Sequence, residues 1–224
     1  PQANERPQYF AADVRDLLAW LANEPLMEGH PFRNVKAYPQ GETVPETWIL
    51  GSSDYGAQVA AHFGLPYAFA WFFTDGRGGK QAIDLYRQSF KPSARYPEPH
   101  AAICVWALAA ASEDEALFHY GPRARTRLLR DQGIFAALEP PDVVAAYDYS
   151  DAEKARIEQQ RATTLIGTAE QVGEGIRALA GDLGVQEVAV VTWAYDEHVR
   201  QESYRLLAVD MGLDASAASE APQG

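Results

Sequence analysis

The stretch of sequence that decides the fold runs from residue 48 to residue 69 and reads Trp-Ile-Leu-Gly-Ser-Ser-Asp-Tyr-Gly-Ala-Gln-Val-Ala-Ala-His-Phe-Gly-Leu-Pro-Tyr-Ala-Phe. Its first three residues are all apolar, which predicts a short strand buried on both faces. A helix is predicted over residues 55–63, with Gly64 and Pro66 ending it. A second apolar strand is predicted over residues 67–73. This order of strand, helix and strand indicates an α/β fold with parallel strands.

The same alternation continues towards the carboxyl end of the chain. Further apolar strands are predicted over residues 101–110 and 188–193. Three capping boxes, each a Ser or Thr followed three residues later by Glu or Gln, predict helices that begin at Ser112, Ser150 and Thr168. Other helices are predicted over residues 10–23, 80–90, 125–132 and 196–207.

Strands that are apolar on both faces and alternate with helices are typical of a parallel sheet covered by helices. Two architectures have this pattern, a (β/α) barrel and an open doubly wound sheet. Only four clear strands are predicted, whereas a closed barrel needs eight. The sequence therefore predicts either about half a barrel or a small open sheet.

The bulk composition excludes several classes of function. The formal net charge of the 224 residues is −12, which disfavours nucleic acid as a partner. The one cysteine, Cys104, lies in an apolar run, where a buried, inert thiol is expected. No run of about 18 apolar residues predicts a membrane span, and no signal peptide is visible. We therefore expect a cytoplasmic protein without membrane association.

A candidate anion site follows the first predicted strand. Gly51 allows a close turn of the backbone, and Ser52 and Ser53 then stand at the start of a helix. Hydroxyl groups and free N–H groups at a helix N-terminus can bind a phosphate. The competing interpretation is ordinary helix capping, in which Ser and Asp are the commonest residues. The residues alone favour capping.

The other strand ends offer less chemistry. Trp71, Phe72 and Phe73 could form the wall of a flat ring system, or they could be core residues or residues that close an adjacent loop. Asp196 and His198 could be an acid/base pair, but helix capping explains them as well. The sequence has no dinucleotide, P-loop or CxxC motif, and its five histidines lack metal-ligand spacing. No catalytic residue and no metal ligand is predicted.

Two blocks of sequence carry a resemblance to a known family. Residues 48–69 resemble the fifth strand, the following helix and the sixth strand of bacterial luciferase-like flavin monooxygenases. Residues 166–172 and 184–192 resemble the eighth-strand region of the same family. The resemblance spans roughly residues 10–212 and implies a (β/α)8 TIM barrel, present here as an incomplete barrel of about strands 5–8. We expect this part to cover residues 1–213, with a looser insertion at about 121–160 and a disordered tail at 214–224.

The resemblance also implies a function. Reduced FMN would lie at the carboxyl-end mouth, its phosphate held at Ser52 and Ser53 with Gly51, Tyr55 and Gly56 beside them. A separate flavin reductase would supply the reduced flavin, and O2 would then oxidise a small organic substrate near residues 71–73. Where the family often carries His, this chain has Phe72, which argues against an acid/base role there.

Two other functions remain open beside FMN-dependent monooxygenation. The first is a non-catalytic half-barrel that binds flavin or dimerises. The second is an oxidoreductase of the same superfamily that uses a deazaflavin. Because strands one to four have no counterpart in this chain, we expect a truncated sequence or a chain that a partner completes, and a homo-oligomer, a dimer, is anticipated.

Overall fold

The computed structural model describes residues 9–41 and 43–213. The predicted disordered tail lies outside the described residues. The chain divides into two compact units, a first unit of residues 1–68 and 81–101 and a second unit of residues 69–80 and 102–224. Each unit is described by itself.

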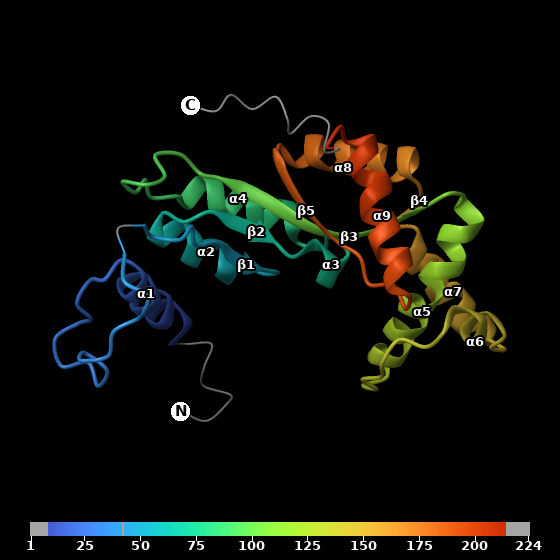
Figure 1. The fold of residues 1–224 in the computed structure, drawn as a ribbon, viewed down its shortest axis with the longest axis horizontal. Coiled ribbons are helices and arrows are strands. Elements are labelled where there is room, and N and C mark those ends of the chain that lie inside the picture. The colour runs from blue at the N-terminus through green and yellow to red at the C-terminus, as the bar shows by residue number, and fades with distance from the viewer. Residues whose placement is uncertain (1–8, 42, 214–224) are drawn as a thin grey trace. The chain divides into compact units, whose positions relative to one another are not determined.

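The first unit contains the stretch that decided the fold. Its elements are α1 (Phe10–Leu21), β1 (Ile49–Gly51), α2 (Asp54–Phe63), most of β2 (Tyr67–Phe69) and most of α4 (Gly79–Ser89). Helix α2 packs against β1 (Figure 1). Gly64 ends α2 with a left-handed φ of 61°, and a Cβ there would lie 2.5 Å from the carbonyl oxygen of Lys91. Only glycine fits this position, which confirms the predicted end of the helix.

The second unit holds the rest of the chain. Its elements are α3 (Trp71–Thr74), nearly all of β3 (Ala101–Ala110), α5 (Glu113–Asp131), α6 (Pro141–Ala145), α7 (Asp151–Arg161), β4 (Leu165–Thr168), α8 (Ala169–Leu183), β5 (Glu187–Val191) and α9 (Glu197–Asp210). The capping boxes of Ser150 and Thr168 are both formed. Ser112 also caps its helix, although the carboxylate of Glu115 accepts from the N–H of Ala111 rather than from Ser112.

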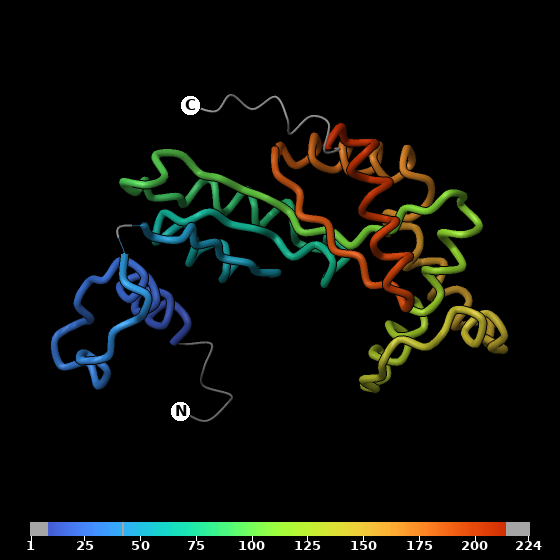
Figure 2. Tube along the Cα trace, in the orientation of Figure 1, coloured from blue at the N-terminus to red at the C-terminus, as the bar shows by residue number. Residues whose placement is uncertain are grey.

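The five strands form a parallel sheet in the order β1-β2-β3-β4, with β5 pairing to β3. The long strand β3 has two partners in succession. Its first half, Ala102 to Trp106, pairs with Glu187 to Val191 of β5, and its second half pairs with β4. The Cα trace follows β5 alongside β3 (Figure 2). The prediction of an incomplete (β/α) barrel is confirmed.

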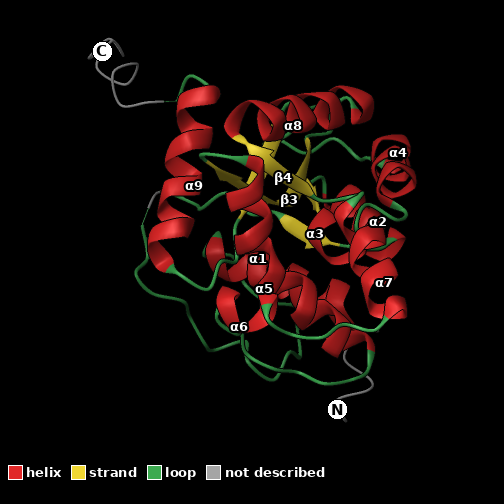
Figure 3. Cartoon of the chain, turned by 90° about the vertical axis from the view of Figure 1, so that its right-hand side faces the viewer, coloured by secondary structure: helices red, strands yellow, loops and turns green. Residues whose placement is uncertain are grey.

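Strand β3 is apolar on both faces because helices cover both. Ala107 and Ala109 pack with residues of α8 and α9, including Val172 and Leu207. Trp106 and Leu108 face the other way and pack with Tyr120 and other residues of α5. Strands β3 and β4 lie between these helices in Figure 3. This double burial is the physical reason that an unbroken apolar run signalled a parallel sheet.

The strand predicted over residues 67–73 is wrong in its second half. Strand β2 ends at Phe69, and Trp71–Thr74 form the short helix α3. Asp75 closes this helix with a φ of 52°, and Gly76 follows with a φ of 82°. Two consecutive left-handed residues turn the chain sharply, which no apolar pattern reveals.

Two further elements differ from the prediction. The helix expected over residues 125–132 is the last part of α5, which continues through Pro122. Strand β4 was not predicted as a separate strand, because its four residues are too few to show a periodicity. Among the described residues, no helix is long and apolar enough to cross a membrane.

Candidate functional site

The predicted anion site lies at the junction of β1 and α2. Ser52 and Ser53 are both exposed, and Ser53 is the N-cap residue of α2. Its side chain makes no capping hydrogen bond, whereas Ser112, Ser150 and Thr168 each accept a bond from their own helix. The hydroxyl of Ser53 is therefore not used for capping. The N–H groups of residues 54–56 come before the first hydrogen bond of the helix, and the side chain of Ser53 accepts from none of them.

Two glycines bring the backbone of this junction close together. A Cβ on Gly51 would lie 3.5 Å from the Cα of Gly56, and a Cβ on either residue would lie within 3.7 Å of the Tyr67 ring. Gly51, Ser53 and Gly56 thus surround one buried aromatic side chain. The result is a tight turn that exposes two hydroxyl groups and packs on the ring of Tyr67.

Tyr67 is the base of this turn, and the sequence pattern did not single it out. The side chain is fully buried, and its hydroxyl lies 3.5 Å from the carbonyl oxygen of Gly51 and 3.4 Å from that of Ser53, to which it donates. Burial raises the pKa of Tyr67 well above its usual value, and the negative charge of Asp54 raises it further. The hydroxyl therefore remains a donor at neutral pH, and its one proton is shared between the carbonyl oxygens of Gly51 and Ser53.

Replacement of Tyr67 by phenylalanine should loosen this turn. The loss of a hydrogen bond in a buried place should lower the free energy of unfolding by about 1 kcal/mol. If the turn holds a flavin phosphate, the Kd for FMN should rise by roughly fivefold, the equivalent of the same free energy. Thermal unfolding and FMN titration measure the two effects.

Tyr86 provides the matched control for that variant. It is also fully buried in the first unit, and its hydroxyl donates to the carbonyl of Leu65 and accepts from the N–H of His100. Tyr86→Phe should cost a similar amount of stability and leave FMN affinity unchanged. Equal losses of FMN affinity in the two variants would contradict a specific role for Tyr67.

Two neighbours complete the surroundings of the turn. Asp54 lies in the first turn of α2, and its carboxylate accepts a hydrogen bond from Gln81 Nε2 at 3.1 Å. This carboxylate would repel a phosphate, although the amide of Gln81 engages one of its oxygens. Tyr55 is 42% exposed, and its ring lies 6.1 Å from that of Phe10.

The three predicted aromatic residues belong to the second unit and have different roles. Trp71 packs on its own turn, since a Cβ on Gly76 would lie only 2.1 Å from its ring. Phe72 meets the ring of Trp193 edge-on at 5.6 Å. Phe73 is 59% exposed, and its ring lies 4.5 Å from that of Phe72. The loop-closing interpretation therefore describes Trp71, while Phe72 and Phe73 form an aromatic surface.

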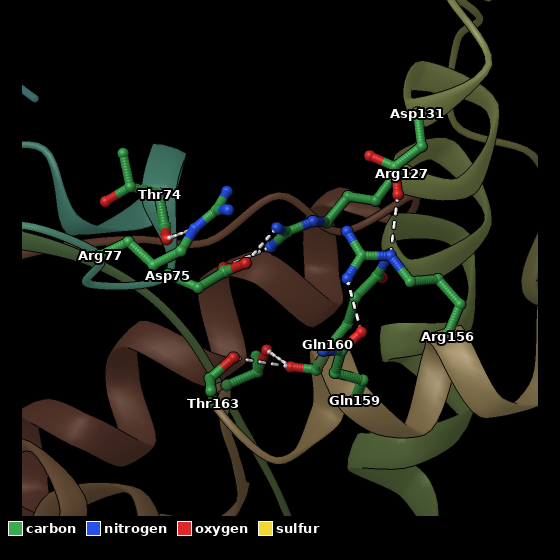
Figure 4. Close-up of polar contacts among 10 residues, drawn as sticks. Thr74, Asp75, Arg77, Arg127, Asp131, Arg156, Gln159, Gln160 and Thr163 are labelled. Carbon is green, nitrogen blue, oxygen red and sulfur yellow. Dashed lines mark hydrogen bonds and ion pairs between the residues drawn. The ribbon is translucent and has the colours of Figure 1, made fainter.

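An ion pair fixes the turn that follows these aromatics. Both carboxylate oxygens of Asp75 accept hydrogen bonds from the guanidinium of Arg127 on α5 (Figure 4). The side chains of Asp75 and Arg127 are only 20% and 17% exposed. The turn after α3 is thus tied to α5 by a bidentate, mostly buried pair.

The remaining candidates resolve into structural roles. Asp196 caps α9 by accepting from the N–H of His198 at 2.8 Å, which is the capping role that the sequence also allowed. Cys104 is half-buried, and burial raises the pKa of its thiol, as expected for an inert cysteine. No group of three or more possible metal ligands occurs within residues 9–41 and 43–213.

Comparisons with known proteins agree with the fold. The family model for luciferase-like monooxygenases matches residues 14–187. A luciferase-like monooxygenase of Escherichia coli is 33% identical over 88% of this chain and 57% of its own length. Among solved structures, apo-MsnO8 is 26% identical with a TM-score of 0.73, over 92% of this chain and 61% of that one.

A more distant structure shares the fold alone. The oxygenating constituent of 3,6-diketocamphane monooxygenase from Pseudomonas putida, solved in complex with FMN, is 16% identical with a TM-score of 0.51, over 90% of this chain and 61% of that one. This chain thus spans about three-fifths of the length of the relatives that it matches.

Proposed function

The chain belongs to the luciferase-like monooxygenase family, and on that premise we propose that it takes part in flavin-dependent monooxygenation, with reduced FMN and O2 oxidising a small organic substrate. The observation that carries this proposal is the uncapped turn between β1 and α2. The hydroxyl of Ser53 makes no capping hydrogen bond, and the neighbouring Ser52 is exposed. The turn thus offers two hydroxyl groups and a helix N-terminus to a phosphate.

The residues of the turn fit the phosphate of FMN. Ser52 and Ser53 would donate to its oxygens together with the N–H groups at the start of α2, and Gly51 and Gly56 would let the backbone approach. Tyr67 would hold the turn rigid from below. Reduced FMN, when bound, supplies the electrons with which O2 is activated. The chain's own residues position the cofactor and exclude water from it.

The activity of the whole protein, its substrate and its partners belong to the same proposal. A separate reductase would supply the reduced flavin, and a dimer would be the working form. The relative solved with FMN shares the fold, which supports FMN as the cofactor. The aromatic surface of Phe72 and Phe73 would lie near the flavin ring or the substrate.

The test is direct titration of the complete protein with FMN. Quenching of flavin fluorescence and a rise in the melting temperature should both accompany binding, since a ligand that binds only the folded state stabilises it. Competition with a deazaflavin should leave FMN bound. Displacement by the deazaflavin would assign the other cofactor, and the absence of any flavin binding would remove the proposal.

A second measurement separates catalysis from simple binding. The complete protein should consume O2 in the presence of reduced FMN and a suitable organic substrate, above the rate for reduced FMN alone. Flavin binding without any effect on this rate, over a broad panel of substrates, would point to the non-catalytic flavin-binding alternative.

A further inference from the structure

Arg123 on α5 is a buried cation that the proposed function does not use. The residue is only 3% exposed. Its Nε and Nη1 atoms are buried and have no hydrogen-bond partner among the described residues. Buried arginine normally pairs its donors, because an unpaired buried charge is costly. Such a group calls for a ligand or a functional explanation.

Asp75 acts on Arg123 electrostatically but makes no hydrogen bond with it. Both carboxylate oxygens of Asp75 are engaged by Arg127. Burial, together with the nearby charge of Arg127, lowers the pKa of Arg123 to about 10. The guanidinium therefore remains charged at neutral pH, with an excess of positive charge along this face of α5.

Aromatic rings surround the guanidinium. Its carbon lies 4.2 Å from the ring centroid of Trp106 and 5.9 Å from that of Trp193. Phe72 meets Trp193 edge-on. Cation–π attraction to these rings partly replaces the missing hydrogen bonds, but it leaves the N–H groups of Nε and Nη1 without an acceptor.

The position of this cluster in the fold is that of a ligand site. Trp106 belongs to the face of β3 that packs with α5, opposite the face covered by α8 and α9 (Figure 3). Helix α5 follows β3 directly in the chain, so Arg123 and Trp106 come from consecutive elements. Trp193 follows the carboxyl end of β5 by two residues. Ligands of such barrels bind at the carboxyl ends of the strands.

We propose that Arg123 binds the carboxylate of an organic acid whose apolar body packs against Trp193 and Phe72. The planar guanidinium matches a carboxylate through two parallel hydrogen bonds, and the rings suit an aromatic or aliphatic body. Trp193 is 38% exposed, so one side of this aromatic cluster faces solvent. The inference rests on the proposed function, because it identifies this acid as the substrate class of that reaction.

The experiment uses phenylacetate and its neutral analogue phenylacetamide as probes. The complete protein, without flavin, is titrated with each while tryptophan fluorescence is recorded. Phenylacetate should bind at least about tenfold more tightly than the amide, since a hydrogen bond to a charged group is worth about 1.5–3 kcal/mol. Arg123→Met should weaken phenylacetate binding by roughly 10- to 100-fold and abolish the preference over the amide.

Two variants control for structural effects. Arg130→Met removes an exposed arginine of the same helix and should leave both affinities unchanged. Arg123→Lys keeps the charge but loses the planar fork, so it should retain part of the preference for the carboxylate. The melting temperature of Arg123→Met should be unchanged or higher, because an unpaired buried charge has been removed.

Several outcomes would overturn the inference. Equal affinity for the two probes in the unmodified protein would do so, as would an unchanged preference in Arg123→Met. A lower melting temperature for this variant, without any preference in the unmodified protein, would mean that Arg123 has only a structural role. Loss of FMN affinity instead of phenylacetate affinity would assign the cation to the cofactor.

FMN titration of the same samples keeps the two proposals apart. Intact FMN binding with no selectivity for the carboxylate would refute the role of Arg123 alone. Absent FMN binding with clear carboxylate selectivity would refute the flavin proposal and leave an organic-acid site.

Discussion

Replacement of both Ser52 and Ser53 by alanine is expected to raise the Kd for FMN by about 100-fold or more, while the fold remains intact. The two hydroxyl groups would each donate to a charged phosphate, and each such hydrogen bond is worth about 1.5–3 kcal/mol. Their joint loss corresponds to at least about two powers of ten in affinity. Fluorescence titration with FMN measures the effect.

The structure predicts that this double variant is nearly as stable as the unmodified protein. Both residues are exposed, and the side chain of Ser53 makes no capping bond that could be lost. Ser150→Ala is the matched control, because Ser150 does cap its helix in a complete capping box. That variant should lose about 1 kcal/mol of stability and no FMN affinity.

The opposite pattern would refute the phosphate assignment. If Ser52→Ala/Ser53→Ala lowered the melting temperature like Ser150→Ala and left FMN binding unchanged, the two serines would be capping residues and nothing more. The comparison is informative because the same residue type stands at the start of a helix in both places, and only one of the two is engaged with its own helix.

Replacement of Arg127 by methionine is expected to lower the free energy of unfolding by about 3 kcal/mol. Asp75 would then keep a carboxylate that is only 20% exposed and has lost its bidentate partner. The turn after α3 would lose its connection to α5, which also disturbs the neighbouring Phe72. Urea or thermal unfolding measures the loss.

The pair offers two informative controls. Asp75→Asn combined with Arg127→Met removes the stranded charge and should recover a good part of the lost stability. Arg156→Met breaks an ion pair with Asp131, also shown in Figure 4, whose side chains are 38% and 50% exposed. That exposed pair should contribute less than about 1 kcal/mol. Equal losses for Arg127→Met and Arg156→Met would show that burial of the Asp75 pair has no energetic consequence.

The two arginines of α5 illustrate a division between stability and binding. Arg127 is paired with Asp75 and holds the structure together, whereas Arg123, four residues earlier on the same helix, is buried without a partner. Residues four apart lie on the same face of a helix, so both side chains reach the same region. A protein that leaves one of them unpaired gives up stability there, as is common at binding sites.

The sequence alone determined the class of fold and the place of the turn between β1 and α2. Unbroken apolar strands require cover on both faces, and only a parallel sheet with helices on each side provides it, as the packing of Trp106 and Ala107 on opposite faces of β3 confirms. Gly64 and the capping boxes at Ser150 and Thr168 set helix boundaries through local backbone chemistry, which a sequence shows directly.

Only the tertiary structure decided which polar groups are engaged. The sequence could not tell whether Ser53 caps its helix, that Tyr67 supports the turn, or that Arg123 is buried without a partner while Arg127 has Asp75. The contacts of Tyr67 and of Arg127 join residues far apart in the chain, and periodicity carries no information about them. The capping of Ser53 depends on the orientation of one hydroxyl group, which the residue type does not determine. Local backbone chemistry determined where the helices and strands begin and end. Packing between distant residues determined which hydrogen-bond donors and charged groups are left without a partner in the protein.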